Sequence, residues 1–158
     1  MTRLAVLLAL GVPLLLAGRA PALDLAPRDV HARAGLSLDP DQVHVGVQAD
    51  FGPRGRIAFR PSFDVGVGNG LWLFSLNGDV LYRFAPAGRL RPFLGAGPAL
   101  SLSDVTDGVG EMDGLSAGLA GHALAGLEWR LGGARTLVEA RAGFGDTADF
   151  KLTLGVAF

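Results

Sequence analysis

Three histidines, His31, His44 and His122, are the side chains of this sequence best suited to proton transfer near neutral pH. None has a serine at a spacing that marks a nucleophilic triad, and the absence of cysteine excludes a thiol nucleophile and thiolate metal sites. Ser116 and His122 are the one pair that a lipid-modifying enzyme could use. Both fall on the polar face of one predicted strand, which we expect to face a closed interior that lipid does not reach. We therefore assign no catalytic residue and expect these side chains to form hydrogen bonds.

Oxygen ligands gather in one long connection, Ser103 to Gly114, which holds Asp104, Asp107, Glu111 and Asp113. The regular Asp-x-Asp-x-Asp-Gly order of a calcium-binding EF-hand loop is missing, so we expect a solvated loop. The glycine-rich stretch from Gly66 to Gly70 joins two predicted strands instead of opening a helix, which makes it a turn rather than a phosphate site. The sequence therefore assigns no metal and no other cofactor.

The composition favours one β-rich domain with a buried core. Of 158 residues, 49% are hydrophobic and 18% are charged, and 24 are glycine. Such a chain is too apolar for disorder, and it holds too few charges for long surface helices rich in Glu and Lys. One domain is expected, because no internal repeat, linker or low-complexity tract is visible.

The first 22 residues have the pattern of a secretory signal peptide. Arg3 precedes an apolar run from Leu4 to Ala17, and Ala20 to Ala22 supplies the small residues that a signal peptidase requires. The run is about 14 residues, shorter than the roughly 20 that a helix needs to cross a bilayer. Two of the 14 basic residues and none of the 15 acidic ones precede the expected cleavage site, so residues 23–158 carry a net charge of −3. Nothing in this balance suggests a nucleic-acid partner.

Apolar and polar residues alternate with a period of two along most of the remaining chain, which predicts β-strands with two different faces. Asn77-Gly78 resembles a hairpin turn, but the apolar residues keep the same phase on both sides of it, so one continuous strand is predicted there. Short connections separate the segments, and neighbours should pair antiparallel. The predicted strands are residues 29–38, 43–51, 57–67, 71–84, 91–102, 115–131, 136–144 and 150–158.

Eight alternating strands predict a barrel, and the polar face indicates which way it points. That face carries charges of both signs separated by small residues, which suits a narrow, crowded interior and not a surface in lipid. Asp50, Arg60, Arg83 and Arg130 belong to this face. We expect an interior charge network of desolvated, paired side chains, formed by Arg33, Asp64, Asp79, Glu128, Glu139, Arg141 and Lys151.

Aromatic residues and turn charges favour the same orientation. Trp72 and Tyr82 lie ten residues apart on one face, which is roughly 33 Å along a strand. At a strand tilt of about 40° this corresponds to a height of roughly 25 Å, which matches the apolar band of an outer-membrane barrel. Alternate connections carry only acidic or only basic charge, and the longest falls at the acidic end, which we expect to be external. Two aromatic girdles follow from the strand map, one with Phe51, Phe59, Tyr82, Phe84, Trp129 and Phe158, the other with Trp72, Phe74, Phe144 and Phe150.

On these features the chain resembles the small eight-stranded outer-membrane β-barrels of bacteria, the OmpA, OmpX and OmpW kind, over about residues 23–158. The resemblance implies an all-β, eight-stranded antiparallel up-and-down transmembrane β-barrel in the outer membrane. No wall-anchoring domain of the OmpA kind is expected after the last strand. The resemblance also implies that the C-terminal segment is the signal read by the outer-membrane assembly machinery, carried by Phe150, Leu152, Leu154, Val156 and Phe158.

The leading hypothesis for function is a non-enzymatic, monomeric barrel embedded in outer-membrane lipid, with a structural or surface-interaction role. An open, porin-like pore is not expected, because eight strands leave an interior that side chains fill. Two alternatives stay open at this point. One is a lipid-modifying outer-membrane enzyme, and the other is a secreted soluble lipocalin-like barrel that binds lipid in an apolar interior.

Overall fold

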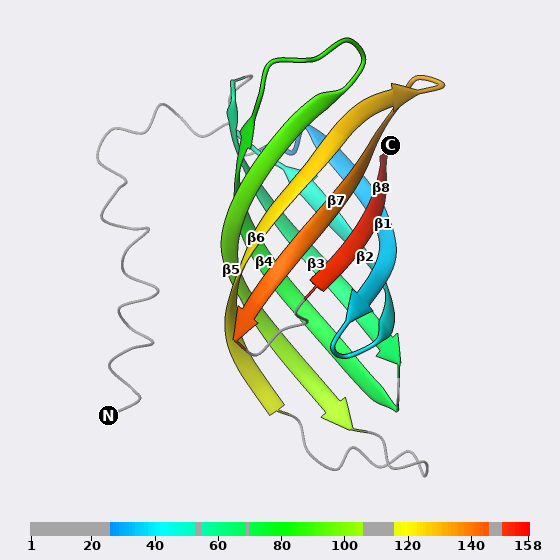
Figure 1. Cartoon of the computed structure of the whole chain (residues 1–158), viewed down its shortest axis with the longest axis vertical. Helices are drawn as coiled ribbons and strands as arrows, with labels where there is room; N and C mark the ends of the chain where they lie inside the picture. The colour runs from blue at the N-terminus through cyan, green and yellow to red at the C-terminus, as the bar shows by residue number, and fades with distance from the viewer. Residues whose placement is uncertain (1–25, 53–54, 69, 106–115, 146–149) are drawn as a thin grey trace, which may run out of the picture.

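The chain forms a closed barrel of eight antiparallel β-strands, each paired with its sequence neighbours, and β1 pairs with β8 to close it (Figure 1). The computed structural model describes residues 26–52, 55–68, 70–105, 116–145 and 150–158, so the expected signal peptide, residues 1–22, lies outside them. No helix in this part of the chain is long and apolar enough to cross a membrane. The predicted eight-stranded up-and-down barrel is confirmed. Its strands are β1 (Asp29–Leu38), β2 (Gln42–Asp50), β3 (Ile57–Gly68), β4 (Leu71–Arg83), β5 (Arg91–Val105), β6 (Ser116–Leu131), β7 (Ala134–Gly145) and β8 (Phe150–Ala157).

Two strand boundaries differ from the prediction by two or more residues, because backbone pairing continues into the predicted connections, and the other boundaries agree to within one residue. β5 extends to Val105, which pairs with Leu71 of β4, although the prediction ended this strand at residue 102. β7 begins at Ala134 instead of residue 136. The prediction that Asn77-Gly78 forms no hairpin is confirmed, since β4 runs through both residues. The acidic residues Asp107, Glu111 and Asp113 lie outside the described residues.

Residues alternate between the two faces of the barrel wall. In β8, Lys151 and Thr153 are buried, whereas Leu152 and Leu154 are exposed. Large apolar side chains of all eight strands are exposed in this way, and Leu154 leaves 59% of its surface uncovered. The barrel therefore has an apolar outside, the reverse of the soluble lipocalin-like alternative.

Glycines allow β4 and β5 to approach closely at one point of the wall. A Cβ added to Gly97 would lie 2.1 Å from the carbonyl oxygen of Gly78, which is backbone and cannot turn aside. Any side chain at this position would force the two strands apart.

Gly97→Ala should therefore lower the free energy of unfolding of the barrel by about 1 to 3 kcal/mol, because the wall must shift to admit the methyl group. Gly55→Ala is the matched control, since a Cβ at Gly55 meets no atom within 4 Å. Urea unfolding of both variants in detergent measures the difference. Equal midpoints for the two variants would contradict the close approach of β4 and β5.

Candidate functional site: the charged interior and the arginine rim

The interior of the barrel is filled with charged and polar side chains. Five cationic and five anionic residues are buried among the described residues, so the formal charges balance. Burial of an ion is costly unless it is paired, and this balance allows pairing throughout. The buried ions include all seven residues of the predicted network, and they are Arg33, Arg60, Arg83, Arg141, Lys151, Asp50, Asp64, Asp79, Glu128 and Glu139.

Glu139 of β7 lies at the centre of this charge network. Its carboxylate oxygens lie 2.9 Å from a guanidinium nitrogen of Arg141, 3.3 Å from one of Arg60 and 3.5 Å from one of Arg33. The side chain is 1% exposed. One carboxylate thus connects β1, β3 and β7, three strands that are far apart in the sequence.

A second centre of the network forms around Arg60. Its guanidinium donates two hydrogen bonds to Asp50, of 2.6 and 3.2 Å, and one of 2.9 Å to Glu128. Arg83 contacts the same two carboxylates. The guanidinium carbon of Arg60 also lies 4.9 Å from the ring centroid of Phe93, a cation–π contact. Every charge in this group therefore has at least one partner.

The remaining residues of the predicted network have fewer partners each. Arg33 Nε lies 3.1 Å from Asp64, and a guanidinium nitrogen of Arg141 lies 2.9 Å from Asp79. Asp79 is shared with His122, whose Nε2 contacts it. Among the described residues Lys151 forms no ion pair, and its ammonium donates to Ser75 Oγ at 3.4 Å. The carboxylate partner expected for Lys151 is therefore replaced by a hydroxyl.

One charged residue of the predicted polar face does not lie inside. Arg130 is exposed, because it pairs with Arg135 one step from the end of β6, where the strand has passed the last layer of interior side chains. The alternation assigns Arg130 to the interior face. Its exposure depends on whether other strands extend far enough to cover this end of β6, which the alternation does not show.

Sequence analysis missed the apolar part of the interior. Ala58, Leu81, Phe93 and Leu124 form a buried cluster inside the barrel. Gly126 makes room for the aromatic ring, since a Cβ there would lie 2.3 Å from Phe93 Cζ. The sequence does contain a sign of this. Phe93 has the same alternation phase as the small residues of β5, and those residues face inward.

The Ser116 and His122 pair does not form. The two residues stand six positions apart on β6, roughly 20 Å along the strand, and Ser116 is exposed instead of interior. A serine–histidine contact that sequence analysis missed joins Ser37 Oγ to His44 Nδ1 at 3.1 Å. The other ring nitrogen of His44 lies 3.0 Å from the Thr153 hydroxyl, not from a carboxylate. Because Ser37 and His44 are both buried, this contact is closed to a substrate.

The aromatic girdle residues of β4 lie on the outer face at its two ends. Trp72 stacks on Phe74 at the start of the strand, with ring centroids 6.5 Å apart. Tyr82 meets Phe84 edge to face at the other end, with centroids 5.0 Å apart. Phe158, the last residue, is 86% exposed at this same end, where its backbone N–H donates to the carbonyl of Val30 at 3.1 Å. Trp129, near the same end of β6, is half-buried.

Comparison with solved structures identifies barrels of the same architecture. The N-terminal β-barrel domain of Pseudomonas aeruginosa OprF matches with a TM-score of 0.68 at 16% sequence identity, covering 82% of this chain and 94% of that one. The chain has the fold of the small outer-membrane β-barrels. Neisserial surface protein A matches with a TM-score of 0.63 at 15% identity, covering 82% and 92% of the two chains. No protein-family model matches the sequence, and no curated protein does.

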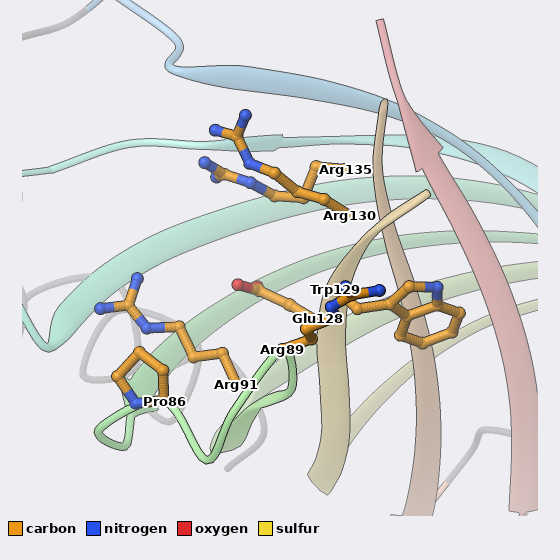
Figure 2. A pocket seen from close by; sticks show the side chains of 7 residues that line it. All are labelled: Pro86, Arg89, Arg91, Glu128, Trp129, Arg130 and Arg135. Carbon is orange, nitrogen blue, oxygen red and sulfur yellow. The ribbon is translucent and has the colours of Figure 1, made fainter. Parts of the chain in front are cut away.

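In this chain, one end of the barrel is rich in arginine. Both ends of the described chain lie at that end (Figure 1). A recess of about 600 Å³ opens there above the interior network. Figure 2 shows Arg130 and Arg135 extending side by side from β6 and β7, with Arg91 and Glu128 reaching into the same space and Trp129 turned away. We call this the rim recess, and it is lined by Pro86, Arg89, Arg91, Glu128, Trp129, Arg130 and Arg135.

Proposed function

We propose that this chain is a non-enzymatic, monomeric integral protein of the outer membrane with a structural or surface-interaction role. The apolar outer face on all eight strands carries the proposal, because a continuous apolar surface of this kind is stable in lipid and not in water. A closed barrel also leaves no unpaired strand edge, which a lipid environment requires. Export by a cleaved signal peptide and insertion by the outer-membrane assembly machinery belong to the same proposal.

The interior supports a structural role over transport or catalysis. Glu139 and Arg60 connect strands across the barrel, and their partners occupy the space that a channel would need. The Ser37 and His44 contact is buried and has no carboxylate to orient the ring, so it lacks the arrangement of an activated nucleophile.

Membrane fractionation combined with gel mobility tests the proposal. The expressed chain should sediment with outer membranes, show a β-rich circular dichroism spectrum in detergent, and change its gel mobility only after boiling, because the closed barrel resists detergent until heated. A chain that stays soluble and monodisperse without detergent would contradict the membrane assignment. Covalent labelling of Ser37 by a fluorophosphonate would contradict the non-enzymatic role.

A further inference from the structure

The rim recess holds more positive charge than its surroundings neutralise. Four arginines line it, against the single carboxylate of Glu128. Glu128 already contacts Arg60 and Arg83 in the interior network. The recess therefore keeps a positive charge that its own lining does not balance.

Two of the four guanidinium groups are free to bind. Within the described part of the chain, no ion pair or side-chain hydrogen bond involves Arg89 or Arg130, and both side chains are exposed. Arg91 uses its Nε to donate to the Phe84 carbonyl at 3.4 Å, and its terminal N–H groups contact no side chain or carbonyl of the residues that the structure describes. Arg135 contacts Asp29. The planar fork of a free guanidinium fits the oxygens of a phosphate group.

The strand register adds an independent sign of an anionic ligand. Arg130 and Arg135 occupy directly opposed positions on β6 and β7, and like charges placed opposite each other across a strand pair destabilise the pairing. Asp29 offsets the charge of Arg135 only. A bound anion between the two guanidinium groups would relieve this repulsion.

A second recess widens the same basic surface. It shares Arg91 and Arg135 with the rim recess and adds Arg28 and Arg83. Two carboxylates also line it, and both are already paired, Asp29 with Arg135 and Asp50 with Arg60 and Arg83. Four arginines against two aspartates line this second recess, so the surplus of positive charge extends over the mouth of the barrel.

We propose that the rim recess binds the phosphate group of an anionic ligand, either the headgroup of a phospholipid or a soluble phosphate. Trp129 belongs to the lining of the recess, but its indole ring is turned away from the arginines, which places an interfacial aromatic ring next to the recess and favours the lipid. The lipid source rests on the membrane location proposed above, whereas phosphate recognition by the arginines does not.

Binding measurements on the folded full chain in uncharged detergent test the site. Native mass spectrometry compares phosphatidylglycerol with diacylglycerol, which lacks the phosphate, and calorimetry follows inorganic phosphate. The double variant Arg89→Gln/Arg130→Gln should weaken phosphatidylglycerol binding by about tenfold or more, since each charged hydrogen bond contributes on this scale. Both side chains are exposed, so the barrel should keep its heat-dependent gel mobility.

Arg56→Gln is the matched control, because Arg56 is exposed at the same end, donates to the Tyr82 hydroxyl at 3.0 Å and does not line the rim recess. Its affinity should stay within about twofold of the parent. Binding of inorganic phosphate without a preference for phosphatidylglycerol over diacylglycerol would assign the soluble source. The proposal is overturned if neither ligand binds, if the double variant binds like the parent, or if Arg56→Gln weakens binding as much as the double variant does.

Discussion

Glu139→Ala should lower the free energy of unfolding of the barrel by about 3 to 5 kcal/mol. The substitution removes the carboxylate that Arg33, Arg60 and Arg141 share, and it leaves their guanidinium groups buried with fewer partners. A stranded interior charge costs more than a lost surface ion pair, because the narrow interior admits little water to solvate it. Urea unfolding in detergent, followed by tryptophan fluorescence, measures the shift in midpoint.

Two further variants separate charge from shape at this position. Glu139→Gln keeps the size of the side chain and its capacity to accept hydrogen bonds, so its loss should fall between the parent and Glu139→Ala. Asp41→Ala removes the same charge from an exposed turn and should change the midpoint little. If Glu139→Ala unfolded at the same midpoint as Asp41→Ala, Glu139 would not hold the interior together.

Deletion of Phe158 should reduce the amount of folded barrel in the outer membrane several-fold, while refolding in detergent stays nearly unchanged. Its ring is 86% exposed and packs against little, so the folded barrel loses only a modest rim contact. The larger effect is expected from the assembly signal, in which Phe158 directly follows β8 and continues the alternation of its outward-facing residues. Quantifying the heat-modifiable band in membranes, beside refolding yield in vitro, separates the two roles.

Phe144→Ala provides the matched comparison for this deletion. Phe144 is also exposed on the outer face, at 63%, and β7 carries it toward the opposite end of the barrel. It should reach the membrane at close to the parental level, because it lies outside the C-terminal segment. Parental membrane levels for the Phe158 deletion would remove the C-terminal segment from the assembly proposal.

In the interior, alternation predicts which face a residue occupies but not which residues it contacts. Alternation places Glu139 and Arg141 on the inner face of β7, and both are buried there. It gives no sign that Arg60 of β3 meets Glu139, since the residues are 79 positions apart. Nor does it show that Lys151 bonds to Ser75 instead of a carboxylate. These partners are set by which residues of distant strands reach the same height in the barrel.

At the rim, too, the sequence predicts the charge of the residues, and strand pairing sets their neighbours. The sequence predicts basic connections at one end, but it places Arg130 inside, and only the register of β6 against β7 sets it opposite Arg135 at the edge of a recess. Ser37 and His44 likewise meet through the pairing of β1 and β2, although neither belongs to a catalytic motif.

The sequence by itself determined the number of strands, their order and the inner face of the charged residues within each strand, because a period of two is a local property that neighbouring residues express together. It also determined that β4 is unbroken at Asn77-Gly78. Only the tertiary structure decided the partners of Glu139, the room that Gly126 leaves for Phe93 and the exposure of Arg130. Those features depend on the relative heights of strands around a closed wall, which closure of β1 onto β8 fixes and which no single strand encodes.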